Sequence, residues 1–167
     1  MTQLKPISVA GVPAALQKAE RYRLLNDSPA AESICLDIVA VDPKNQSAVI
    51  TLILAITDQF EGAESADALH RAQELLPRID DRYKRAYYEG IVYERRAKAQ
   101  LHRLLPGAAA MAADWYHRAM DCYEKAEEIR PAGNDEAILR WNTCVRMLAK
   151  HEPVAGTRDE YEPALDD

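Results

Sequence analysis

Two stretches of the sequence share one spacing: AESICLDIVAVDP, residues 31–43, and AMDCYEKAEEIRP, residues 119–131. Each begins with Ala, has a larger residue four positions later (Cys35 or Tyr123), and ends in Pro. Apolar residues recur between these positions every three to four residues, which is the period of one face of an α-helix. Because proline cannot continue a helix, each stretch predicts a helix that ends at a turn.

A second set of segments repeats another pattern of small and large residues, in which Gly90 lies between Ala86 and Tyr93. Together the two patterns resemble the tetratricopeptide repeat family, whose unit is a helix–turn–helix of about 34 residues with the pattern W-x2-L-G-x2-Y…A-x3-F…P. The residues that carry the second pattern are Ala15, Lys18, Ala19 and Tyr22; Val49, Leu52, Ile53 and Ile56; Ala86, Glu89, Gly90 and Tyr93; and Ile138, Trp141, Asn142 and Val145.

The resemblance implies an all-α fold: an α–α superhelix of about three helical hairpins followed by a C-terminal capping helix. Pro43 and Pro131 are 88 residues apart, against about 68 for two ideal periods. The third hairpin is therefore expected to be enlarged, with a break at Pro106 and Gly107.

Clusters of Pro, Gly, Asn and Asp divide the chain into seven helical segments. Asn26-Asp27-Ser28-Pro29 supplies cap residues and a first-turn Pro, and Gly133-Asn134 supplies a stop and a cap. The predicted helices cover 12–26, 29–41, 46–60, 64–76, 80–104, 108–130 and 134–151. We expect a flexible N-terminus at 1–11, one helical domain at 12–151, and a disordered acidic C-terminal tail at 152–167.

The segment from Ala48 to Phe60 is apolar nearly all round, so it is expected to lie between neighbours in the middle of the assembly. Its β-branched residues leave a strand as an alternative. The length of the segment and the lack of a period-2 alternation favour the helix.

Composition limits the function classes. The chain has 167 residues, a formal net charge of −6 and no long apolar run, which argues against nucleic acid and membrane partners. No signal peptide is expected at the N-terminus. The three cysteines, Cys35, Cys122 and Cys144, are widely spaced and favour buried free thiols over a disulfide framework or a zinc site. A cytoplasmic protein is expected.

In such a repeat the first helices line a concave groove that binds peptides or helices of other proteins. Carried over by register, the resemblance gives a groove with an apolar middle and a cationic, tyrosine-rich end. This chemistry suits a protein partner with an apolar anchor and acidic flanks. The candidate groove residues are Arg23, Ile50, Leu54, Lys84, Tyr87, Tyr88, Ile91, Arg95 and Arg146.

Two alternatives remain for this groove. Tyr87, Tyr88 and Tyr93 can pack between helical layers instead of facing a partner. The basic stretch from Arg78 to Arg103, eight cations against four acids, can be a solvated helix face, or can receive an acidic partner or the chain's own acidic tail. The carboxylate clamp of some family members is not expected, because only its lysine is present, as Lys84.

Catalysis, cofactors and metals are not expected. The four histidines lie on different predicted helices, and no phosphate-binding loop or nucleophile elbow is present. The sequence predicts a protein–protein interaction adaptor or scaffold. The alternatives are a dedicated client chaperone or assembly factor, and a structural self-assembly module such as a homodimer.

Overall fold

The computed structural model describes residues 2–62, 65–103 and 105–151. Within these ranges the chain forms seven α-helices and two short 3-10 helices, and the prediction of an all-α protein is confirmed. The α-helices are α1 (Val12–Leu24), α2 (Ser28–Val41), α3 (Gln46–Thr57), α4 (Ser65–Leu75), α5 (Arg82–His102), α6 (Ala108–Glu128) and α7 (Glu136–His151); the 3-10 helices are η1 (Val9–Gly11) and η2 (Leu76–Arg78).

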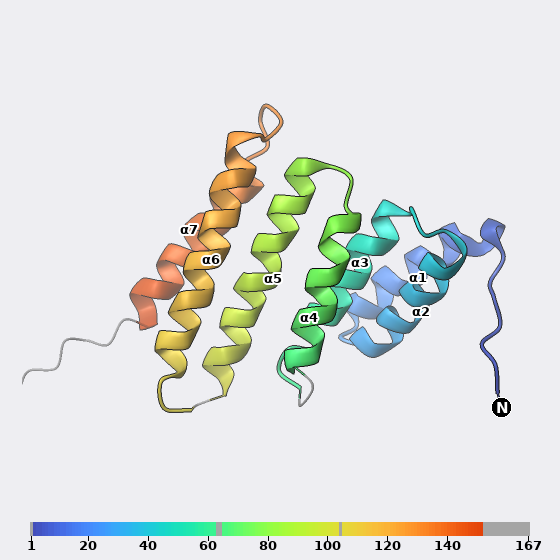
Figure 1. Cartoon of the computed structure of the whole chain (residues 1–167), viewed down its shortest axis with the longest axis horizontal. Coiled ribbons are helices and arrows are strands. Elements are labelled where there is room, and N and C mark those ends of the chain that lie inside the picture. The colour runs from blue at the N-terminus through green and yellow to red at the C-terminus, as the bar shows by residue number, and fades with distance from the viewer. Residues whose placement is uncertain (1, 63–64, 104, 152–167) are drawn as a thin grey trace, which may run out of the picture.

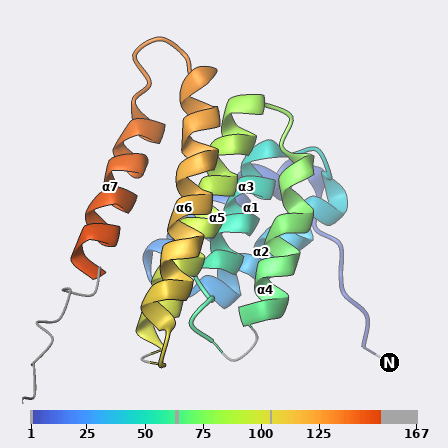
Figure 2. The same ribbon diagram turned by 60° about the vertical axis from the view of Figure 1, so that its left-hand side comes forward.

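The helices pack in chain order, each antiparallel to the next, and form a row from α1 to α7 (Figure 1). Helix α3 also contacts α1 and α5 directly, so alternate helices of the row lie against one another. Turned by 60°, the molecule shows α7 at the outer edge of the row, beyond α6 (Figure 2). Sequential antiparallel packing is the arrangement that short helix–helix connections favour.

Side-chain caps begin three of the helices where the sequence predicts a start. Asp27 accepts a hydrogen bond from the backbone N–H of Ala30, and Asn45 accepts one from Ala48, at 3.2 and 2.9 Å. Asp81 accepts one from Lys84 at 2.8 Å. Each cap satisfies a donor of the first turn that has no partner within its helix.

Several helices are shorter than predicted, because their last residues enter turns. Helix α1 ends at Leu24 instead of residue 26, and Asn26 adopts a left-handed conformation with φ of 59°. Helix α6 ends at Glu128, and Gly133 takes φ of 79° in the turn that follows. A left-handed residue is a common helix stop and favours glycine or asparagine.

Helix α3 lies at the centre of the first core cluster. Val49, Leu52, Ile53 and Ile56 are all at most 2% exposed. The segment is helical throughout Gln46–Thr57, so the strand alternative is wrong. An apolar helix buried on nearly every side matches its predicted place between neighbours.

Helices α5 and α6 make the most extensive helix pair, and α6 packs tightly against α5 at Gly90. A Cβ added at Gly90 would lie 2.5 Å from Cε1 of Tyr123, a residue that is completely buried. Glycine costs about 1 kcal/mol relative to alanine in a helix interior. At this position the missing side chain of Gly90 leaves the space against α5 that the Tyr123 ring fills.

The segment before α1 is partly packed. Ser8 caps η1, and Ile7 packs against the cluster formed by Val12, Ile38 and Ala48. The predicted acidic tail at 152–167 lies outside the described residues. The three cysteines are buried free thiols, as predicted, and burial raises the pKa of Cys35 to about 11 and those of Cys122 and Cys144 to about 12.

Candidate functional site

All nine candidate residues lie on α1, α3, α5 or α7. These helices contact one another in sequence, α1 with α3, α3 with α5, and α5 with α7 through the pair Arg140–Glu94. We call the exposed surface of these four helices the odd-helix face. Lys84 and Arg146 are exposed on it, whereas Ile91 is 3% exposed and offers no surface to a partner. Ile50 and Tyr88 are half-buried and pack against the core.

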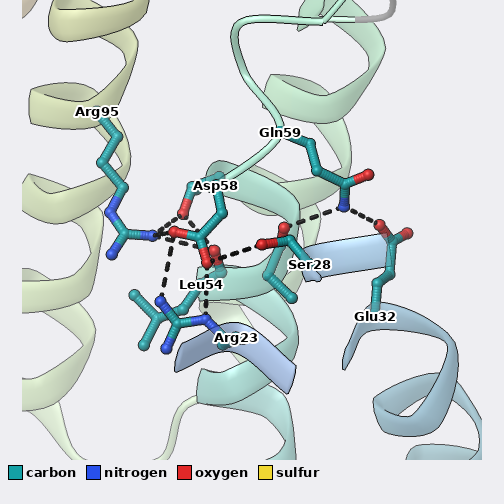
Figure 3. Close-up of polar contacts among 9 residues, drawn as sticks. Arg23, Ser28, Glu32, Leu54, Asp58, Gln59 and Arg95 are labelled. Carbon is teal, nitrogen blue, oxygen red and sulfur yellow. Dashed lines mark hydrogen bonds and ion pairs between the residues drawn. The ribbon is translucent and has the colours of Figure 1, made fainter. Parts of the chain in front are cut away.

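Two of the candidates, Arg23 and Arg95, converge on one carboxylate, Asp58, which caps the C-terminus of α3 (Figure 3). Arg23 donates from Nε to Asp58 Oδ2 at 2.8 Å, and Arg95 donates from Nη1 to Oδ1 at 2.5 Å. The Ser28 hydroxyl adds a bond at 3.3 Å. Asp58 thus joins α1, α2 and α5 to the end of α3.

Arg95 bonds to the backbone and to a hydroxyl of α3 as well as to the Asp58 carboxylate. Its Nη1 also donates to the backbone oxygen of Leu54 at 3.0 Å and to the hydroxyl of Thr57 at 2.7 Å. Burial lowers the pKa of Arg95 from its ordinary value, and Asp58 acts in the opposite direction. All three of these bonds start from Nη1, so this end of the guanidinium is engaged within the protein.

A second network crosses α2, α3 and α4 beside Asp58. Gln59 donates to Glu32 at 2.6 Å and to the backbone oxygen of Ala55 at 3.0 Å. Arg71 of α4 forms an ion pair with the same Glu32. These contacts join α2 and α4 to the turn that follows α3, and Figure 3 shows the bond between Gln59 and Glu32 beside Asp58.

Glu94, the residue that precedes Arg95 on α5, faces the C-terminal half of the molecule. Its side chain is 1% exposed and accepts from Lys98 at 2.6 Å, from the hydroxyl of Tyr123 at 2.7 Å and from Arg140 at 3.3 Å. Burial and the nearby Glu94 raise the pKa of Tyr123 well above its usual range. Glu94 therefore joins α5 to α6 and α7.

A cavity of about 230 Å³ lies on the odd-helix face beside Asp58. Its lining contains three cations, Arg95, Lys98 and Arg140, and two acids, Asp58 and Glu61. Lys98 and Arg140 each retain 39% exposure of the side chain. This is the place on the face where charged donors reach both the protein and the solvent.

The predicted tyrosines form a ring cluster. The Tyr87 ring stacks on Tyr83 at 5.9 Å between centroids, meets Tyr88 edge-on at 5.2 Å and tilts against Tyr123 at 6.0 Å. Tyr93 tilts against Trp115 at 5.7 Å, and its hydroxyl donates to Glu89. Two of these contacts, Tyr87 with Tyr123 and Tyr93 with Trp115, cross from α5 to α6, which is the packing that the alternative interpretation of the sequence predicted. The others lie within α5.

The described residues contain no group of three His, Cys, Asp or Glu side chains placed to hold a metal ion. No helix among them is long and apolar enough to cross a membrane. Their three thiols are buried and protonated at neutral pH, which is unlike the lowered pKa of reactive cysteines.

Sequence reasoning missed Asp58, Glu94 and Arg140. Asp58 follows a strongly apolar helix and is spaced from Arg23 and Arg95 by 35 and 37 residues, close to one repeat period. That spacing was an available signal. No such signal marks Glu94 in the sequence, because an acid in a charged helix is usually solvent-exposed.

Comparison with known proteins gave no match to a family model, a curated protein or a solved structure. The tetratricopeptide resemblance therefore rests on the residues quoted above and remains a prediction.

Proposed function

We propose that this protein is an adaptor of the tetratricopeptide type that binds a peptide or helix of another protein on the odd-helix face. The observation that carries the proposal is the cavity beside Asp58, in which the three cations Arg95, Lys98 and Arg140 outnumber the two acids Asp58 and Glu61. An acidic side chain of the partner is the group that this wall suits best, since charge-assisted bonds from Arg and Lys to carboxylates are strong.

The donors available at the cavity support this choice. A guanidinium has five N–H donors and an ammonium has three. Glu94 accepts one hydrogen bond from Lys98 and one from Arg140, and both cations keep 39% of the side chain exposed. A second carboxylate can thus approach the two cations from the solvent side without displacing Glu94.

The surroundings of the cavity supply the other features expected of an interface. Leu139 on α7 is 63% exposed and offers an apolar contact. Lys84 on α5 and Arg146 on α7 are exposed cations of the same face. An apolar contact beside several cations matches a partner that has an apolar anchor with acidic flanks.

The test compares two charge-reversal variants in affinity capture from a lysate of the native organism. One variant changes the face, Lys84→Glu/Arg146→Glu, and leaves Arg95, Lys98 and Arg140 intact because those cations also hold the fold. The matched control, Lys44→Glu/Lys125→Glu, makes the same change in charge at exposed positions away from the odd helices. Circular dichroism checks that both variants keep the helical content of the wild type.

We expect the wild type and the control to retain a common protein, and the face variant to lose about tenfold or more of it, as two lost charge contacts near an interface imply. Equal retention by all three proteins would place the binding site elsewhere. Loss in both variants would show that net charge alone, and not the odd-helix face, determines capture.

A further inference from the structure

An apolar groove of about 500 Å³ lies at the α7 end of the row. It forms where the start of α6, the end of α7 and Leu101 of α5 meet. Helix α6 contributes small residues, which leave the space open, and α7 contributes larger ones. The residues used below are Leu101, Ala109, Tyr116, Met147, Leu148 and His151.

The groove exists because α7 has a helix on only one side. Met147 and Leu148 are half-buried against the cluster that contains Ala137 and Cys144. The hydroxyl of Tyr116, a groove residue that is 1% exposed, has no hydrogen-bond partner among the described residues. A buried hydroxyl without a partner is unfavourable by about 1–3 kcal/mol, so an occupant that supplies an acceptor would be favoured.

We propose that the acidic segment 152–167, which continues α7, occupies this groove and places Tyr161 and Leu165 against its apolar wall. The segment starts directly after His151, and His151 itself lines the groove. Tyr161 and Leu165 are four residues apart, and five of the segment's six acids lie within two residues of one of them, so the segment brings apolar and acidic groups together.

The segment is long enough to turn back into the groove. The groove residues of α6 run from Gly107 to His117, a distance of about 15 Å along a helix. Tyr161 is ten residues beyond His151, and ten extended residues span about 33 Å. A connection of this length can reach every part of the groove and leaves slack for the reversal.

Charge favours this occupant over a second copy of the chain. Residues 101–117 and 147–151, which include every residue that lines the groove, contain two cations, Arg103 and Lys150, and one acid, Asp114. Residues 152–167 contain six acids and one Arg. A second copy would place a region of the same net positive charge against this one, whereas the segment brings opposite charge. Its covalent connection also gives an effective concentration of about millimolar, so even weak contacts suffice.

The experiment uses the full chain with pairs of introduced cysteines and a mild oxidant. The test pair is Ala109→Cys with Ala164→Cys, which leaves Tyr161 and Leu165 in place. The control pair is Met111→Cys with Ala164→Cys. Met111 is 51% exposed, does not line the groove, and lies two residues from Ala109, about 200° around α6. The native thiols are buried in both proteins.

We expect the intramolecular disulfide to form about tenfold faster with Ala109→Cys than with Met111→Cys, at a rate independent of protein concentration, as effective concentration requires. Adding Tyr161→Ser/Leu165→Ser should reduce the faster rate to that of the control. Circular dichroism checks that each protein folds.

Two results would overturn the proposal. Equal rates for the two pairs would show that the segment has no preference for the groove. Crosslinked dimers whose formation accelerates with concentration would show that a second copy occupies it. Neither result depends on a protein partner at the odd-helix face, so the proposed function and this inference fail independently.

Discussion

Two adjacent residues of α5, Glu94 and Arg95, join the helix to opposite halves of the molecule by different means. Arg95 reaches the N-terminal half through Asp58, a carboxylate whose side chain is 24% exposed. Glu94 reaches the C-terminal half and is itself 1% exposed. Both networks contain one carboxylate and two cations, but only Asp58 has water as an alternative partner.

This difference in exposure should determine how much each network stabilises the fold. An ion pair near water gains little, because solvent and salt screen the charges and compete for the same groups. A buried carboxylate depends fully on its protein partners, and removal of one member leaves the others unsatisfied. The two networks therefore allow a comparison within one chain.

The largest effect is expected from Glu94→Ala. Lys98 and Arg140 can turn toward solvent, but the buried hydroxyl of Tyr123 loses its acceptor and a cavity replaces the carboxylate. An orphaned hydroxyl plus a cavity costs about 3 kcal/mol. Chemical denaturation monitored by circular dichroism measures this loss in the free energy of unfolding.

The matched variant Glu94→Gln separates charge from hydrogen bonding. Its amide oxygen can still accept from Tyr123, so about half of the loss should return. If Glu94→Ala unfolds no more easily than the wild type, the carboxylate does not join α5 to α6 and α7 as the geometry indicates.

A smaller loss in the free energy of unfolding is expected from Gly90→Ala, which tests the packing of α5 against α6 in the C-terminal half. The new Cβ would lie 2.5 Å from the Tyr123 ring, and overpacking of this kind costs about 1–3 kcal/mol. Alanine returns up to about 1 kcal/mol through its helix propensity. The net change in the free energy of unfolding should be a loss of about 1–2 kcal/mol.

The control for this prediction is a double-mutant cycle with Tyr123→Leu. The smaller side chain removes the clash, so Gly90→Ala should be neutral or stabilising in that background. A loss of the same size in both backgrounds would assign the effect to the helix itself and not to the contact between α5 and α6.

The sequence predicted the helices well because their signals are local. Asn45 and Asp81 cap helices by bonds to residues three positions away, and Pro and Gly mark turns within a few residues. The apolar character of α3 was enough to place it at the centre. The helix ends were less accurate, since a left-handed residue such as Asn26 can stop a helix before its pattern ends.

The candidate site was predicted less well because its contacts are not local. Arg95 bonds directly to the backbone oxygen of Leu54, but Arg23 and Arg95 meet through Asp58, which is 35 and 37 residues away from them. The repeat register predicted that Ile91 lies in the groove, but its side chain is buried in the core. Glu94 would be exposed in most helices of this composition, and only the approach of α6 and α7 buries it.

The smallest effect is expected from Asp58→Asn, which completes the comparison of the two carboxylates. Arg23 and Arg95 lose their charge partner, but the amide oxygen still accepts hydrogen bonds and both arginines reach solvent, with side-chain exposures of 21% and 26%. A loss of about 1 kcal/mol is expected, since partly exposed ion pairs contribute little. Denaturation in low salt and in about 1 M NaCl distinguishes the two networks, because the Debye length falls to about 3 Å at that concentration. The loss from Asp58→Asn should shrink in high salt, whereas the loss from Glu94→Ala should not, since it arises from a buried hydroxyl and a cavity. Equal salt dependence for the two variants would mean that exposure does not separate the networks, and α5 would then join both halves by the same kind of contact.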